Sequence, residues 1–83
     1  MEIIVYTMVG CSSCNIIKEL FQRADVNYTE YVLNKDISLS ELKEKYPHVN
    51  FFPFVVIDNE EVGGLIETAK LFLEKGLVSS KRK

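Results

Sequence analysis

Two cysteines, Cys11 and Cys14, are the side chains of this sequence best suited to covalent chemistry, and two serines separate them. They are the only cysteines among the 83 residues, so each has only the other as an intramolecular partner. Such a pair can serve as a metal site, as a stabilising disulfide or as a redox-active disulfide. The composition of the chain and the position of the pair favour one of these three uses over the other two.

A structural zinc site takes four ligands, chiefly from cysteine and histidine. The chain offers two cysteines and one histidine, His48, which we expect to lie on the surface. A purely stabilising disulfide is also disfavoured, because the loop that it would close is very short and gives little entropic gain. A C-x-x-C motif near a βαβ pattern is typical of a thioredoxin-like redox site. Redox chemistry is therefore the favoured interpretation.

The expected helix after the first cysteine makes the two sulfur atoms unequal. Its apolar face recurs at helical spacing and consists of Cys14, Ile17, Leu20, Phe21 and Ala24. Cys14 therefore faces the core, whereas Cys11 lies at or just before the helix N-terminus, where the helix dipole and free N–H groups stabilise a thiolate. We expect Cys11 to attack a disulfide and Cys14 to resolve the mixed disulfide.

The remaining elements follow from hydrophobic pattern and from start and stop signals. A capping box, Ser38 to Glu41, begins one helix, and Pro47 ends it. Strands are expected over 2–8, 28–33, 54–57 and 61–62, and helices over 12–24, 38–46 and 65–75. The apolar face of the last helix is expected to be Leu65, Ile66, Ala69, Phe72 and Leu73. The order βαβ-α-ββα predicts an α/β fold, a four-stranded mixed sheet with helices on both faces.

Length and charge narrow the class of protein further. We expect a single domain over 1–83, with 76–83 as a C-terminal tail whose basic end is solvated. The net charge of −2 and the lack of a basic face argue against nucleic-acid binding. The sequence contains neither a signal-peptide pattern nor an apolar run of about 20 residues, so we expect no membrane segment and a cytoplasmic location.

Three landmarks in this order give the sequence a family resemblance: the C-x-x-C motif, NFFPFVVIDN and EVGGLIE. Over residues 2–76 the chain resembles the glutaredoxins. The resemblance implies a thioredoxin-like fold and glutathione as the reductant, and we expect a monomer. It also implies that Pro53 is cis and faces the active cysteine, although the base rate alone, about 5–6% cis, favours trans.

The resemblance also implies a glutathione site. Its expected contacts are Phe52, Pro53, Gly64, Ile66 and Glu67, with Tyr6, Ser12 and Ser13 as supporting residues. The Gly63-Gly64 pair lets the backbone approach a ligand closely, and the following helix N-terminus attracts a carboxylate. Glu67 has two open interpretations, as a contact to the amino group of the ligand or as a cap of its own helix.

Two departures from the family weaken the expected hold on glutathione. Met8 stands where the family often has a basic residue, and Ser13 stands where it often has tyrosine. We expect Lys18 and Arg23, further along the helix, to be solvated. The nearest alternative to a glutathione-dependent enzyme is therefore a thioredoxin-like electron donor that is reduced by a reductase.

Ser12 is a third departure, because the family commonly has proline after the first cysteine. The Ser12 N–H and hydroxyl can donate hydrogen bonds to the Cys11 sulfur, which favours the thiolate. Family members without that proline include carriers of a [2Fe–2S] cluster, so a cluster bridged by Cys11 and glutathione in a dimer is a second alternative. The main interpretation includes no metal.

Taken together, the residues and the resemblance predict a glutathione-dependent dithiol–disulfide oxidoreductase. Its expected partners are glutathione and disulfide-containing proteins, and the resemblance implies ribonucleotide reductase among them. Its expected substrates are protein disulfides or glutathione mixed disulfides.

Overall fold

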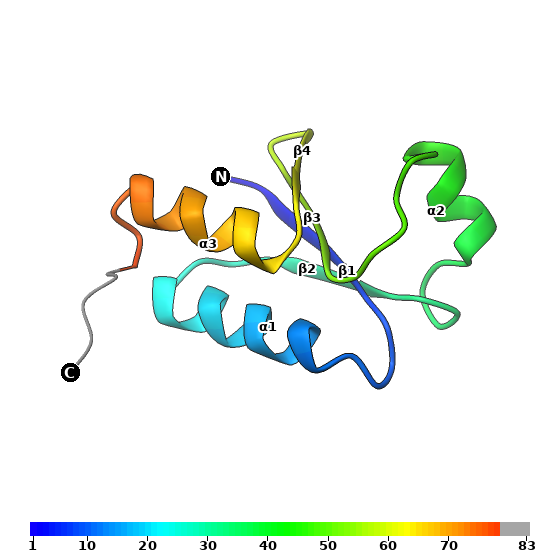
Figure 1. Cartoon of the computed structure of the whole chain (residues 1–83), viewed down its shortest axis with the longest axis horizontal. Coiled ribbons are helices and arrows are strands. Elements are labelled where there is room, and N and C mark those ends of the chain that lie inside the picture. Colours follow the sequence, from blue (N-terminus) through cyan, green and yellow to red (C-terminus); the bar gives the residue numbers. More distant parts are fainter. Residues whose placement is uncertain (79–83) are drawn as a thin grey trace.

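The computed structural model describes residues 1–78 and shows four strands and three helices in the predicted order (Figure 1). The elements are β1 Ile3–Thr7, α1 Ser12–Ala24, β2 Thr29–Val32, α2 Leu39–Lys45, β3 Phe54–Ile57, β4 Glu60–Gly63 and α3 Leu65–Glu74. The strand order is β2-β1-β3-β4. β1 and β2 are parallel, whereas β3 is antiparallel to both β1 and β4. The fold is thioredoxin-like, which confirms the predicted fold class.

The two central strands, β1 and β3, are nearly continuous apolar runs because helices cover both of their faces. Every residue of β3 is buried. Tyr6 of β1 lies opposite Tyr31 of β2 and Phe54 of β3 in the register. β1 ends at Thr7, and the chain then leaves the sheet and enters the loop that carries Cys11.

Two separate hydrophobic clusters fill the faces of the sheet. On one face, α1 and α3 lie against each other and bury Ile17, Phe21 and Phe72 (Figure 1). On the other face, α2 and the segment after it bury Leu42 and Val49. Helices therefore cover both faces, as predicted, and the helix with the two cysteines is packed on the same side as α3.

The hairpin between β3 and β4 is tighter than expected. Asp58 and Asn59 form its two-residue turn with φ values of 51° and 67°, and Ile57 pairs directly with Glu60. Two consecutive left-handed residues are typical of a type I′ turn, which suits the twist of a hairpin. β4 consequently begins one residue earlier than the sequence pattern indicated and continues through Gly63.

The predicted inner face of α3 is partly wrong. Ile66 is 66% exposed and Leu73 is 40% exposed, whereas Thr68 and Phe72 are fully buried. Positions 65, 68 and 72 form the face that packs on the sheet, and hydrophobicity alone did not distinguish it from the neighbouring face. The exposed position of Ile66 becomes important at the site.

The remaining predictions about chain organisation are tested only in part. Gly76, with a φ of 74°, follows the end of α3 as expected. The basic residues predicted to form a solvated end lie outside the described residues, and the single-domain assignment stays a prediction. Over residues 1–78, α1 is the longest helix at 13 residues, and none of the three helices has the length and hydrophobicity to cross a membrane.

Candidate active site

Cys11 caps the N-terminus of α1. Its backbone is extended (φ −99°, ψ 107°), and its sulfur accepts a hydrogen bond of 3.1 Å from the Cys14 N–H. The two cysteines form a disulfide, with their Cα atoms 5.3 Å apart. After reduction, the same N–H and the helix dipole would stabilise a thiolate at Cys11. The predicted position of Cys11 is confirmed.

Cys14 occupies a different environment one turn into the helix. Only 2% of the residue is exposed, on the same side of α1 as the buried Ile17 and Phe21. Its sulfur is thus held against the core while that of Cys11 is partly open to solvent. This inequality is the arrangement expected of an attacking and a resolving thiol.

The Phe52–Pro53 peptide bond is cis, as the family resemblance implied. Pro53 is buried, and the Phe52 carbonyl oxygen lies 3.8 Å from the Cys11 sulfur. In the reduced protein the Cys11 thiol could donate to this carbonyl. The segment before β3 therefore lies beside the reactive sulfur, although it is about 40 residues away in the sequence.

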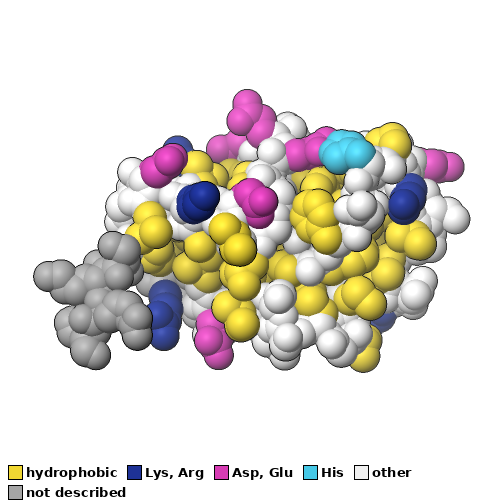
Figure 2. All heavy atoms as spheres, in the orientation of Figure 1, with side chains coloured by type: hydrophobic (Ala, Val, Ile, Leu, Met, Phe, Trp, Pro, Cys, Tyr) yellow, Lys and Arg dark blue, Asp and Glu magenta, His cyan; other side chains and the backbone are white. Residues whose placement is uncertain are grey.

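A groove of about 280 Å³ lies between the start of α1, the cis-proline segment and the start of α3. Its lining consists of Ser13, Phe51, Phe52, Pro53, Gly64, Leu65, Ile66 and Glu67. All five residues predicted to contact glutathione line this groove, together with Ser13. On this face of the molecule, exposed hydrophobic side chains gather over the seam between α1 and α3 (Figure 2).

Phe51 is the residue of this groove that the sequence analysis missed. It is 42% exposed, and its ring packs edge-on against the buried Phe54 at a centroid distance of 5.8 Å. A Cβ atom on Gly64 would lie 3.5 Å from the Phe51 ring. The missed signal was the first aromatic residue of the Phe51-Phe52-Pro53 segment, two positions before the proline.

At the N-terminus of α3, the Gly64 N–H donates a hydrogen bond of 3.0 Å to the Glu67 carboxylate. Glu67 therefore caps its own helix, which was one of its two open interpretations. The other, a contact to a bound ligand, stays a prediction, and the exposed position of Glu67 in the groove is compatible with it.

Gly63 and Gly64 have different reasons to be glycine. Gly63 has a φ of 123°, and an added Cβ would lie 3.1 Å from Cγ of Glu67. Gly64 has an ordinary φ of −99°, and the nearest atom to its added Cβ is 3.4 Å away. Of these two glycines, only Gly63 has a backbone conformation that would strain a residue with a side chain.

We expect Gly63→Ala to lower the free energy of unfolding by about 1–3 kcal/mol, because alanine is strained at this φ and crowds the Glu67 side chain. Urea unfolding of the oxidised protein measures the change. The matched control is Gly64→Ala, with an expected loss of less than about 1 kcal/mol. Equal losses in the two variants would contradict the assignment of the strain to Gly63.

A second cleft, of about 530 Å³, opens on the other side of the cysteine pair. It is lined by Thr7, Met8, Val9, Gly10, Cys11, Ser12, Cys14, Asn15, Lys18, Glu30, Val32 and Lys35. Met8 and Val9 are exposed in its rim, at 42% and 84%. The two sulfurs therefore lie between two hollows: a largely apolar groove with one carboxylate, Glu67, and a cleft lined by Lys18, Glu30 and Lys35.

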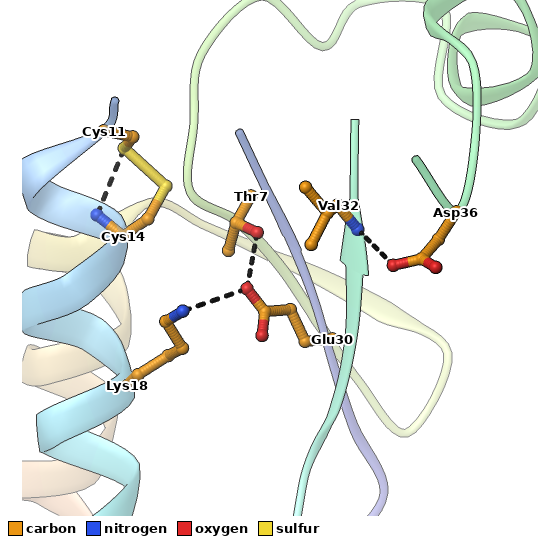
Figure 3. Close-up of polar contacts among 7 residues, drawn as sticks. All are labelled: Thr7, Cys11, Cys14, Lys18, Glu30, Val32 and Asp36. Carbon is orange, nitrogen blue, oxygen red and sulfur yellow. Dashed lines mark hydrogen bonds and ion pairs between the residues drawn. A yellow bond between two sulfur atoms is a disulfide. The ribbon is translucent and has the colours of Figure 1, made fainter. Parts of the chain in front are cut away.

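The charges of the second cleft meet at Glu30 (Figure 3). The Thr7 hydroxyl donates a 2.6 Å hydrogen bond to Oε2 of Glu30, and Lys18 Nζ lies 3.1 Å from the same oxygen. The Thr7 hydrogen bond is the main cause of a lowered pKa at Glu30; burial opposes it, and Lys18 reinforces it. Lys18 is thus 31% exposed and paired with Glu30 rather than fully solvated. Its position four residues after Cys14 was the missed signal.

Tyr6 lies away from both hollows that the cysteines border. It is 2% exposed and stacks on Tyr31 at a centroid distance of 5.6 Å, on the face covered by α2. Burial is the main reason that the pKa of Tyr6 is raised to about 12, and the neighbouring Tyr46 and Tyr31 raise it further. The structure thus gives Tyr6 a packing position rather than a direct contact with the disulfide.

His48 is a surface residue, as predicted. Its side chain is 64% exposed and pairs with Glu61 of β4. Among residues 1–78, no three histidine, cysteine or acidic side chains come together as a candidate metal site.

Comparison with known proteins agrees with this geometry. The family model described as Glutaredoxin matches residues 3–62. Glutaredoxin 1 of Rickettsia bellii (strain RML369-C) is 35% identical over 66 residues, which cover 75% of this chain and 67% of the relative.

Two solved structures illustrate the similarity of fold. The buckwheat glutaredoxin–glutathione complex superposes with a TM-score of 0.75 at 19% identity, covering 90% of this chain and 71% of that one. The thioredoxin-like protein BC3987 superposes with a TM-score of 0.68 at 36% identity, covering 86% and 99% of the two chains.

Proposed function

This chain belongs to the glutaredoxin family, and from that premise we propose that it is a glutathione-dependent dithiol–disulfide oxidoreductase. The family implies thiol–disulfide oxidoreductase activity in general. The observation that carries the more specific proposal is the placement of the Cys11–Cys14 disulfide at the N-terminus of α1, beside a groove that contains every predicted glutathione contact.

In the proposed reaction the reduced protein attacks with Cys11. Its thiolate forms a bond to one sulfur of the substrate disulfide, and the other substrate sulfur leaves with the electron pair and takes a proton. The Cys14 thiol then loses its proton and attacks Cys11, which forms the intramolecular disulfide and releases the second substrate sulfur. Two glutathione molecules restore the dithiol and leave as glutathione disulfide.

The apolar groove is the proposed site of the glutathione moiety. The Phe52 backbone, just before cis-Pro53, offers main-chain groups to the cysteinyl part of the ligand, next to the Cys11 sulfur. The N-terminus of α3 offers N–H groups to its γ-glutamyl carboxylate, beside Gly64 and Ile66. The glutathione complex of the buckwheat relative, which has the same fold, supports this assignment.

Protein disulfides and glutathione mixed disulfides are the proposed substrates, with ribonucleotide reductase as one protein partner. We also propose that the protein is a monomer in the cytoplasm.

The second candidate function is a thioredoxin-like electron donor that is reduced by a reductase. The 36% identity to the thioredoxin-like protein BC3987 and the apolar Met8 at the rim favour this candidate.

The test is a comparison of two electron sources with one disulfide substrate, such as insulin. We expect turnover with glutathione, glutathione reductase and NADPH at least about tenfold above that with thioredoxin reductase and NADPH. The reverse ratio would support the second candidate function, and turnover with neither source would overturn both.

Cys14→Ser is the matched variant for this assay. It should lose reduction of protein disulfides, because no thiol remains to release the mixed disulfide. It should keep the reduction of a small glutathione mixed disulfide, for which Cys11 and free glutathione suffice. Unchanged protein disulfide reduction in this variant would contradict the resolving role of Cys14.

A further inference from the structure

The charged side of the second cleft has no part in the function proposed so far. Its members are Lys18 on α1, Glu30 on β2 and Thr7 at the end of β1, which we call the charged network. These residues line the same cleft as Cys11 and Cys14 (Figure 3). Lys18 lies four residues after Cys14, so the two share one face of α1.

The charged network is held in a defined geometry. One carboxylate oxygen of Glu30 accepts from both the Thr7 hydroxyl, at 2.6 Å, and the Lys18 ammonium, at 3.1 Å. Thr7 is 2% exposed, whereas the Lys18 and Glu30 side chains are 31% and 26% exposed. Partial burial of this kind reduces the screening that makes most surface ion pairs weak.

The resolving step places a specific demand on this cleft. When Cys11 is joined to a substrate sulfur, Cys14 must change from a neutral thiol to a thiolate before it can attack. That negative charge forms on a residue that is only 2% exposed, and burial disfavours a charged sulfur. A fixed charge in the same cleft therefore raises or lowers the fraction of Cys14 present as the thiolate, according to its sign.

We propose that Lys18 and Glu30 are positioning residues that act in opposite directions on the resolving cysteine: the ammonium favours its thiolate, and the carboxylate restrains it. Thr7 anchors the carboxylate and thereby fixes the ammonium. This inference rests on the dithiol function proposed above. The opposite signs follow from the charges themselves, because a cation stabilises a nearby thiolate and an anion destabilises it.

Other charges that face the same cleft act equally on all variants of the network. Lys35 lines the cleft from the loop after β2, and the N-terminal dipole of α1 acts from the helix itself. Cys11 is uncharged while it is part of a mixed disulfide. A serine at position 11 reproduces that neutral state and leaves Cys14 as the only thiol.

The experiment measures the pKa of Cys14 in the Cys11→Ser protein, from the thiolate absorbance at 240 nm as a function of pH. We expect Lys18→Met to raise this pKa by about 0.5–1 unit and Glu30→Gln to lower it by a similar amount. Lys18→Arg keeps the charge and should leave the value close to that of the parent. Lys43→Met on α2, on the opposite face of the sheet, is the matched control and should also have no effect.

The same changes in the two-cysteine protein should alter the rate of resolution. The measurement starts from a glutathione mixed disulfide at Cys11 and follows glutathione release at pH 7. The thiolate fraction changes about three- to tenfold, but a more basic thiolate is also a better nucleophile, with a Brønsted coefficient of about 0.4–0.5. We therefore expect Lys18→Met to slow release about two- to fourfold and Glu30→Gln to accelerate it by a similar factor.

A purely structural ion pair would give a different pattern, because removing either partner would then change the pKa and the rate in the same direction or not at all. Either of these outcomes would overturn the inference. The direct titration needs no enzymatic turnover, so it separates this inference from the proposed function. Opposite pKa shifts without glutathione-linked activity would refute only the function; normal activity without such shifts would refute only the inference.

Discussion

Replacement of Cys11 by serine is expected to reduce every thiol–disulfide activity of this protein to the background rate. A serine hydroxyl stays protonated where a thiol at a helix N-terminus ionises, so no nucleophile remains for the first step. Neither Cys14 nor any other residue can replace it, because Cys14 is buried and no third cysteine exists. The loss should extend to protein disulfides and to small glutathione mixed disulfides alike.

The measurement is the initial rate of both reactions with the glutathione system. The matched control is Gln22→Ala, which leaves both sulfurs in place and changes an exposed residue further along α1. We expect this control to keep most of the activity. Significant turnover by the Cys11→Ser protein would contradict the assignment of Cys11 as the attacking residue, and with it the proposed mechanism.

The largest effect on stability is expected from Phe21→Ala. Phe21 is fully buried, and its ring packs against Tyr28 at 4.8 Å and Phe72 at 5.8 Å between centroids. It therefore joins α1 to α3 on the face of the sheet that supports both cysteines. Removal of a buried phenylalanine costs about 3–5 kcal/mol in lost burial and cavity formation. That is a large part of the roughly 5–15 kcal/mol that stabilises a typical domain.

Urea unfolding of the oxidised protein measures this loss as a lower midpoint. Ile16→Ala on the same helix is the control, because Ile16 is 51% exposed and should cost less than about 1 kcal/mol. Comparable losses in the two variants would show that the core between α1 and α3 does not stabilise the fold as described.

Helical periodicity was enough to separate the two cysteines. Cys14 shares its spacing with Ile17 and Phe21, and all three are buried in the structure. The start of α1 at Ser12 also followed from local signals, because a helix N-terminus depends on nearby residues. Local information of this kind determined the fold class, the order of the elements and the unequal positions of the two sulfurs.

Hydrophobicity was a less certain guide where two faces of a helix compete. α3 buries Thr68 and exposes Ile66, although isoleucine is the more apolar residue. The direction in which α3 packs is set by its contact with α1 and the sheet, and that contact is not encoded in the spacing of α3 alone. Exposure of Ile66 places it in the groove beside the cis-proline segment.

The sequence by itself determined which residues could carry the redox chemistry, because the C-x-x-C motif and its helix are a single local unit. Only the tertiary structure decided what surrounds them. Phe51, Gly64 and Ser13 come from three distant segments and meet in one groove. Lys18 and Glu30 meet because β2 lies parallel to β1 after the crossover through α1. Such contacts depend on how the elements pack, and no local pattern contains that information.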